Sequence, residues 1–175
     1  MAYVILGFLH ISRMSLYDLI KAFESGVSLF YAASSGSIKR ALDGLAEEGA
    51  IKAADGPPGP RGRKEYVITA AGRRKFLEWM TDDIKGDVET EALSRLYFLG
   101  FVDREDRALV LTAISQRLES ELRRFKALEA KIASEDVPEQ LQEVALYQRA
   151  TLDYGLSSLN HALRWFEDQQ TLHHM

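Results

Sequence analysis

A segment rich in proline and glycine interrupts the first half of the chain and limits what can form around it. In ADGPPGPRGRKEYVIT, residues 54–69, three prolines and three glycines fall within seven consecutive positions. Proline removes the amide hydrogen that helices and central strands use, and glycine weakens both, so no regular element runs through this segment. Its flanks AIKAA (50–54) and KEYVIT (64–69) read as two short strands, which predicts a hairpin with a long, stiff loop.

Two helices are predicted ahead of this hairpin. Residues 2–10 are apolar almost throughout and read as a first core helix. In the second helix Ser15 fits the N-cap position and Gly26 ends the segment. Its apolar side chains recur at the spacing of one helical face: Leu16, Leu19, Ile20 and Phe23.

Two more helices flank the hairpin directly. Ser34 or Ser35 can cap a third helix, and Gly49 lies where a C-terminal glycine belongs. Thr69 can cap a fourth helix over residues 70–84. The order of three helices, two strands and a helix is that of a winged helix-turn-helix, in which the hairpin is the wing.

The second half of the chain is expected to be helical. A short apolar helix covers residues 90–102, Asp103 is placed to cap a long amphipathic helix reaching about Ser134, and Pro138 starts a last one. The predicted fold is therefore mainly α with a small β wing. It is divided into a winged helix-turn-helix domain at 1–85 and an α-helical dimerisation domain at 86–175.

Apolar stripes on the two long helices predict a homodimer. The break between the helices is short enough for an antiparallel pair, and two helices alone bury such stripes poorly, so a second chain is expected to cover them. The alternative is that the stripes pack only on their own N-terminal domain. The residues predicted to form the dimer interface are Leu111, Ile114, Leu118, Leu122, Phe125, Leu152, Leu156, Leu159, Leu163 and Phe166.

Charge is distributed unevenly along the 175 residues. The net charge is −4, but residues 1–80 contain eleven Lys/Arg against eight Asp/Glu, whereas residues 81–175 contain eleven against eighteen. The acidic total therefore does not exclude a polyanionic partner for the first half. With no cysteine, no run of about 18 apolar residues and no secretory signal pattern, the sequence predicts a cytoplasmic protein without disulfides or a membrane span.

No motif predicts a reaction, a cofactor or a metal site. The four histidines lack the HExxH or any other metal-binding spacing, and GPPGPRGRK (56–64) lacks the GK[ST] ending of a phosphate-binding loop. The serines at positions 34, 35 and 37 have no histidine nearby in sequence to activate them. The chain is therefore expected not to be an enzyme.

This set of segments resembles the PadR family of transcriptional regulators. The resemblance runs through ILGFL (5–9), SLYDLI (15–20), SSGSIKRALDGLAEEGAI (34–51) and GRKEYVITAAGRRKF (62–76), followed by a helical tail of the expected size. Lys39 and Arg40 stand where the family often has a tyrosine, frequently followed by proline. The resemblance implies a winged, usually dimeric repressor, and some such proteins respond to small aromatic ligands.

The third helix is predicted to read DNA. A winged helix places the N-terminal turns of this helix in the major groove, and Ser34, Ser35, Ser37, Lys39 and Arg40 occupy those turns. Arg40 lies opposite the apolar stripe and is expected to reach a guanine edge. The alternative is that the serines only cap the helix and the two cations form a solvated face.

The wing is predicted to contact the DNA backbone or the minor groove through Arg61, Arg63 and Lys64, because prolines stiffen the loop and less entropy is lost on docking. By resemblance Tyr17 is a further backbone-contact candidate, or else a partly buried core tyrosine. Together these expectations define a DNA-binding transcriptional regulator on a pseudo-palindromic operator, with helix 35–48 in the major groove and wing 55–64 beside it. The alternative is a winged-helix protein-interaction module that does not read DNA sequence.

A small aromatic effector is a further expectation from the resemblance. Aromatic side chains are frequent enough to line an apolar pocket, although aromatic residues at helical spacing also build cores and interfaces. The candidates are Phe8, Trp79, Tyr97, Phe98, Phe101, Tyr147, Tyr154, Trp165 and Phe166.

Overall fold

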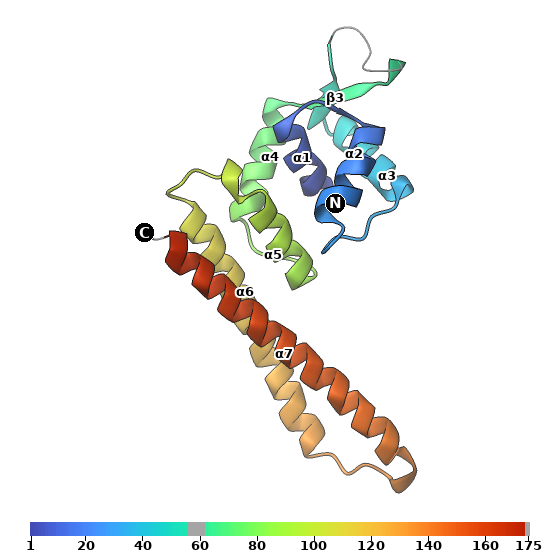
Figure 1. Ribbon diagram of the computed structural model, residues 1–175, viewed down its shortest axis with the longest axis vertical. Coiled ribbons are helices and arrows are strands. Elements are labelled where there is room, and N and C mark those ends of the chain that lie inside the picture. The colour runs from blue at the N-terminus through green and yellow to red at the C-terminus, as the bar shows by residue number, and fades with distance from the viewer. Residues whose placement is uncertain (56–61, 174–175) are drawn as a thin grey trace. The chain divides into compact units, whose positions relative to one another are not determined.

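The computed structural model describes residues 1–55 and 62–173, which form two units, 1–103 and 104–175. The second unit consists of α6 (Arg107–Ala133), the 3-10 turn η4 (Glu139–Leu141) and α7 (Gln142–His173). The first unit contains all the other described elements (Figure 1): α1 (Ala2–Ile11), β1 (Met14–Ser15), α2 (Leu16–Ala22), the π-helical turn η1 (Phe23–Val27), α3 (Ser35–Glu47), β2 (Ile51–Ala53), β3 (Glu65–Ile68), α4 (Ala70–Thr81), α5 (Val88–Tyr97) and the 3-10 turn η3 (Leu99–Phe101).

Helix α1 forms the centre of the first unit, as its apolar sequence predicts. Its side chains from Val4 to Leu9 are buried, and the helix packs against α2, α3, α4 and β3. Gly7 is required at one of these contacts, because a Cβ there would lie 2.6 Å from the ring of Phe98. The chain after α5 therefore comes directly onto α1, so the first unit extends to residue 103 and includes α5, which the sequence placed with the helical tail.

The three strands form one antiparallel sheet in the order β1-β3-β2. The predicted hairpin is confirmed as β2 and β3, with Ile51 opposite Ile68. Strand β1 is not visible in the sequence because it has only two residues, too few for an alternating pattern. It pairs Ser15 with Glu65 and so connects the start of α2 to the strand that follows the wing.

Several predicted helix ends in the first unit are confirmed. Ser15 and Ser34 each accept a hydrogen bond from the third amide of their helix, Thr69 caps α4 in the same way, and Gly49 has a positive φ of 69° after α3. The prediction that Gly26 ends the second helix is wrong, because Gly26 lies inside the π-helical turn η1, which directly continues α2. The prediction that Asp103 caps the long helix is wrong. Residues 104–106 form a turn after the buried Val102, and Asp106 holds the N-cap position of α6.

Helices α6 and α7 of the second unit run antiparallel along each other (Figure 1). Gln170 of α7 joins them: its side-chain amide donates to the Leu111 carbonyl at 2.9 Å and to the Ser115 hydroxyl at 2.7 Å. Within the described residues, no helix is both long enough and apolar enough to cross a membrane.

Candidate nucleic-acid interface

The N-terminal turn of α3 is exposed and closed by two serines. The Ser34 hydroxyl accepts from the Ser37 amide at 3.2 Å, and the Ser37 hydroxyl donates to the Ser34 carbonyl at 2.7 Å. The capping interpretation is thus confirmed for this pair. Ser35 lies exposed between them, at a helix start whose amides and dipole favour an anion such as phosphate.

The two cations of α3 differ in what they contact. The Lys39 ammonium lies 2.6 Å from the Asp43 carboxylate one turn on, and this hydrogen bond raises the pKa of Lys39. Arg40 is exposed and has no carboxylate within ion-pairing distance among residues 1–55 and 62–173. Ile38 and Leu42 are buried on the other side of the helix, as the sequence predicts. Arg40 therefore offers its five N–H donors to a ligand.

At the base of the wing, Arg63 lies over the ring of Tyr17, with its guanidinium carbon 4.0 Å from the ring centroid. Tyr17 is 48% exposed in the first turn of α2, so it is not a core tyrosine. The Lys64 ammonium lies 5.1 Å from the Tyr66 ring centroid. Arg61 falls outside the described residues, and so does the predicted contact at the tip of the wing.

Two carboxylates beside the wing base were not identified from the sequence. Asp18 accepts from the Ser15 hydroxyl at 2.6 Å and from the Ser15 amide at 3.0 Å; these bonds, with the nearby charge of Arg63, lower the pKa of Asp18. Glu65 pairs with Arg13 at 3.0 Å. The spacing of Ser15 and Asp18 is that of a capping box, a signal present in the sequence, whereas the Arg13 pair depends on the unpredicted strand β1.

Three of the five candidate aromatic residues in the first unit are buried in its core, whereas Tyr97 and Phe101 are 45% and 37% exposed. Phe8, Trp79 and Phe98 are 3%, 7% and 2% exposed, and the rings of Phe8 and Phe98 meet edge to face with centroids 5.4 Å apart. Trp79 stacks on Tyr3 at 4.9 Å. For these residues the core interpretation holds, while Tyr147 and Tyr154 on α7 are 66% and 75% exposed.

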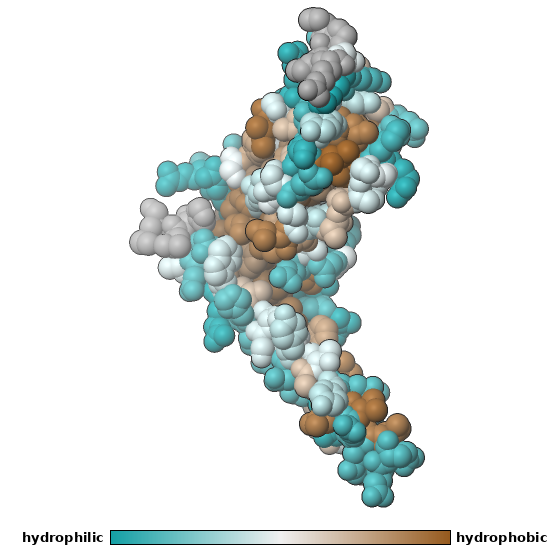
Figure 2. All heavy atoms as spheres, turned by 45° about the vertical axis from the view of Figure 1, so that its right-hand side comes forward, coloured by the Kyte–Doolittle hydropathy of each residue, from teal (hydrophilic) through white to brown (hydrophobic). Residues whose placement is uncertain are grey.

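The predicted dimer stripe is largely covered within one chain. Phe125, Leu152, Leu159 and Leu163 are half-buried, and the other six residues of that set are at most 7% exposed: Leu111, Ile114, Leu118, Leu122, Leu156 and Phe166. Exposed apolar side chains instead gather toward the end of the hairpin where α6 ends and α7 begins (Figure 2): Leu128, Leu141, Val144, Leu146 and Tyr147.

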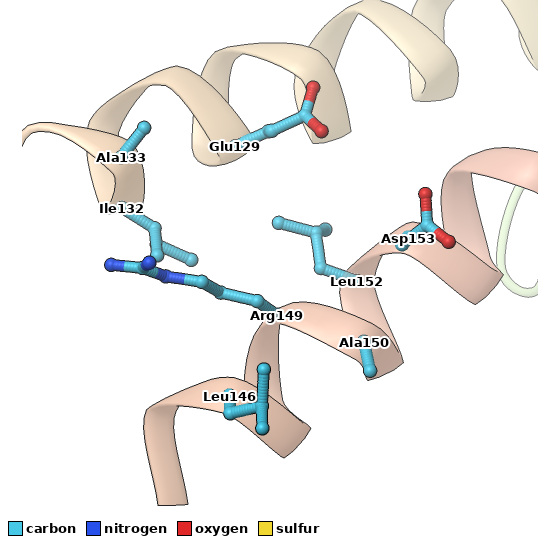
Figure 3. Close-up of a pocket in the computed structure, with 8 residues that line it drawn as sticks. All are labelled: Glu129, Ile132, Ala133, Leu146, Arg149, Ala150, Leu152 and Asp153. Atoms are coloured by element: carbon cyan, nitrogen blue, oxygen red, sulfur yellow. The ribbon is translucent and has the colours of Figure 1, made fainter. Parts of the chain in front are cut away.

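A groove of about 450 Å³ lies between α6 and α7 near this end of the hairpin. Ile132 of α6 and Leu152 of α7 point toward the facing helix, and Arg149 lies beside Ile132 (Figure 3). Glu129 and Asp153 complete its charged rim. The apolar side chains of the groove add to the apolar surface that the hairpin presents.

An exposed, capped helix start that carries an exposed arginine, next to a small sheet with arginine and lysine at the wing base, defines a winged helix-turn-helix DNA-binding protein. Comparison with known proteins agrees. Residues 5–78 match the PadR-like family of transcriptional regulators, and residues 90–173 match the virulence activator alpha C-terminal family. Residues 5–78 therefore form a PadR-like domain, and the chain is a DNA-binding transcriptional regulator.

Individual relatives are distant but similar over almost their whole length. The negative transcriptional regulator PadR of Bacillus subtilis (strain 168) is 22% identical over 168 residues, 94% of this chain and 92% of that protein. The crystal structure of Bacillus subtilis PadR with operator DNA covers 98% of both chains at 21% identity and a TM-score of 0.43. Its structure with p-coumaric acid covers 99% of this chain and 95% of that one, at 20% identity and a TM-score of 0.43.

Proposed function

We propose that this chain is a dimeric repressor that reads a pseudo-palindromic operator through α3. The observation that carries the proposal is Arg40, which is exposed one turn into a capped helix and has no carboxylate partner among the described residues. A winged helix presents this part of its recognition helix to the major groove, where a bidentate arginine is the commonest contact to guanine. Ser34, Ser35, Ser37 and Lys39 then lie beside the phosphates.

The wing supplies the sequence-independent part of binding in this proposal. Arg63 and Lys64 are held at the base of the wing by Tyr17 and Tyr66, and Arg61 is expected to extend the contact to the backbone or the minor groove. Phosphate contacts fix the position of the protein on the duplex without reading its sequence. Affinity is therefore assigned mainly to the wing, and sequence choice to Arg40.

The proposed function also includes repression, a small aromatic effector, a homodimer and a cytoplasmic location. The name of the Bacillus subtilis relative, a negative regulator, supports repression, and its structure with p-coumaric acid supports a small aromatic effector for this chain too. Exposed apolar side chains at the end of the α6–α7 hairpin support a homodimer. Together with the absence of cysteine, a DNA-binding role supports a cytoplasmic protein.

The test is a mobility-shift titration of the wild type and of Arg40→Ala on the DNA upstream of the protein's own gene, with an unrelated duplex of the same length as competitor. The wild type is expected to prefer its upstream duplex. Arg40→Ala is expected to lose about 1–3 kcal/mol of that preference, the value of one good bidentate base contact, while it still binds both duplexes. Equal preference in both proteins would refute the role of Arg40.

A further inference from the structure

Tyr17 and Arg63 are 46 positions apart in the sequence, yet they meet at the wing base, with the guanidinium carbon 4.0 Å from the ring centroid. A guanidinium carries its N–H donors in its own plane, so a ring against its face leaves the donors free. An exposed arginine otherwise samples many rotamers, and its side-chain entropy is lost when it binds. A ring that already holds it lowers that loss.

The register of the sheet explains why these two residues meet. Strand β1 pairs Met14 with Tyr66 and Ser15 with Glu65 in antiparallel order. Helix α2 begins directly after β1, so this pairing brings its first turn, which carries Tyr17, close to the residues that precede β3. The pairing of two strands that are distant in sequence thus brings the Tyr17 ring within reach of Arg63.

Two further interactions hold the Tyr17 side of this contact. Ser15 and Asp18 form the reciprocal cap of α2, which sets the direction of its first turn. Arg13 pairs with Glu65 at 3.0 Å, and the Glu65 side chain is only 12% exposed, so β1 and β3 are joined by side chains as well as by the backbone. Among the described residues no carboxylate oxygen lies within ion-pairing distance of Arg63 itself.

We propose that Tyr17 is a positioning residue: its ring holds the Arg63 guanidinium in the orientation in which it meets a DNA phosphate. The inference rests on the proposed function and deepens it. The resemblance implies that Tyr17 contacts the DNA backbone directly, whereas here its ring orients the arginine that makes the contact. The phenol hydroxyl is then dispensable. The effect of losing the ring passes through Arg63 alone.

The test measures duplex affinity by fluorescence anisotropy for the wild type, Tyr17→Phe, Tyr17→Leu, Arg63→Ala and the Tyr17→Leu, Arg63→Ala double variant. The duplex affinity of Tyr17→Phe is expected to lie within about 1.5-fold of that of the wild type. Tyr17→Leu is expected to bind about three- to fivefold more weakly, which is the value of an exposed cation–π contact. In the Arg63→Ala background Tyr17→Leu should add nothing, since the ring then has no guanidinium to hold. Circular dichroism melts confirm that each variant is folded.

Several outcomes would overturn the role of Tyr17 alone. If Tyr17→Phe binds the duplex as weakly as Tyr17→Leu, the loss of affinity belongs to the hydroxyl and not to the ring. If the losses of affinity of the two single variants multiply in the double variant, the two residues act independently. If Tyr17→Leu does not fold, the affinities of Tyr17→Phe and Arg63→Lys still test whether the ring positions the guanidinium. The first should bind normally, and the second, which keeps the charge without the planar group, should bind more weakly. Failure of the wild type to bind any duplex would instead contradict the proposed function itself.

Discussion

His10 lies between two aromatic rings at the end of α1. The centroid of its ring is 4.7 Å from that of Phe76 and 5.0 Å from that of Phe101. Arg73 approaches its Nδ1 at 3.3 Å, which places the proton of the neutral ring on Nε2 if Arg73 donates. Burial lowers the pKa of His10 and the positive charge of Arg73 lowers it further, so the folded protein resists protonation of this ring.

The lowered pKa of His10 predicts a loss of stability in mild acid. The unfolded chain binds a proton at its ordinary pKa of about 6.5, above the folded value, so stability contributed by the neutral ring is present above that pH and is lost as the pH falls below it. His10→Phe keeps the ring packing and removes the titration. Between pH 7.5 and 5.5 the melting temperature of the wild type should fall further than that of His10→Phe.

The wild type and His10→Phe share every other titrating group, so the difference between their changes in melting temperature reports on His10 alone. An equal or smaller shift in the wild type than in His10→Phe would contradict the assignment of a lowered pKa to His10.

At the scale of elements, the start of α4 packs on the strands of the wing without room for a side chain. A Cβ at Gly72 would lie 2.1 Å from the Ala50 carbonyl oxygen and 2.9 Å from a side-chain carbon of Ile68. The same carbonyl accepts a hydrogen bond from the Thr69 amide at 3.0 Å, so it cannot turn away without losing that bond. Close approach of α4 to the sheet therefore depends on this glycine.

Gly72→Ala is expected to lower the free energy of unfolding by about 2 kcal/mol or more, through overpacking against a backbone atom. Gly44→Ala is the matched control, since Gly44 lies inside α3 and a Cβ added there would meet nothing within 4 Å. That change should raise the free energy of unfolding by about 0.5–1 kcal/mol. Urea titration measures both, and changes of the same sign in the two variants would refute the packing argument.

Several elements of the first unit were predictable because their signals are local. The capping serines and the glycine after α3 depend on a few neighbouring residues, and both are confirmed in the structure. Strand β1 and the Tyr17–Arg63 contact depend on pairing across 46 or more positions, which a single sequence does not record. The ion pair of Lys39 with Asp43 could have been predicted from the sequence, because the two residues are one helical turn apart.

At the scale of the whole molecule, we propose that the α6–α7 hairpin forms a homodimer through its exposed apolar side chains. The sequence marked the apolar stripes correctly as buried surfaces, but periodicity does not say whether the covering helix belongs to the same chain. In the structure α6 and α7 cover much of the predicted stripe themselves. The surface left for a partner includes Leu146 and Tyr147, which are 61% and 66% exposed.

Light scattering at micromolar concentration should give about twice the 19.7 kDa mass of one chain. The double variant Leu146→Glu, Tyr147→Glu should shift the mass toward one chain, because it places charge on the apolar surface. Ser157→Glu, an exposed polar site on the same helix, is the matched control and should remain a dimer. A monomer mass for the wild type would contradict the proposed dimer.

The central claim is that cations of α3 and of the wing base bind the phosphates of duplex DNA, although the whole chain has a net charge of −4. The most direct measurement is the affinity of the wild type for its upstream duplex as the salt concentration is raised. Each neutralised phosphate contributes about −0.9 to the slope of log affinity against log salt, so a slope of several units is predicted. Equal affinity at low and moderate salt, or no binding to any duplex at low salt, would contradict the account.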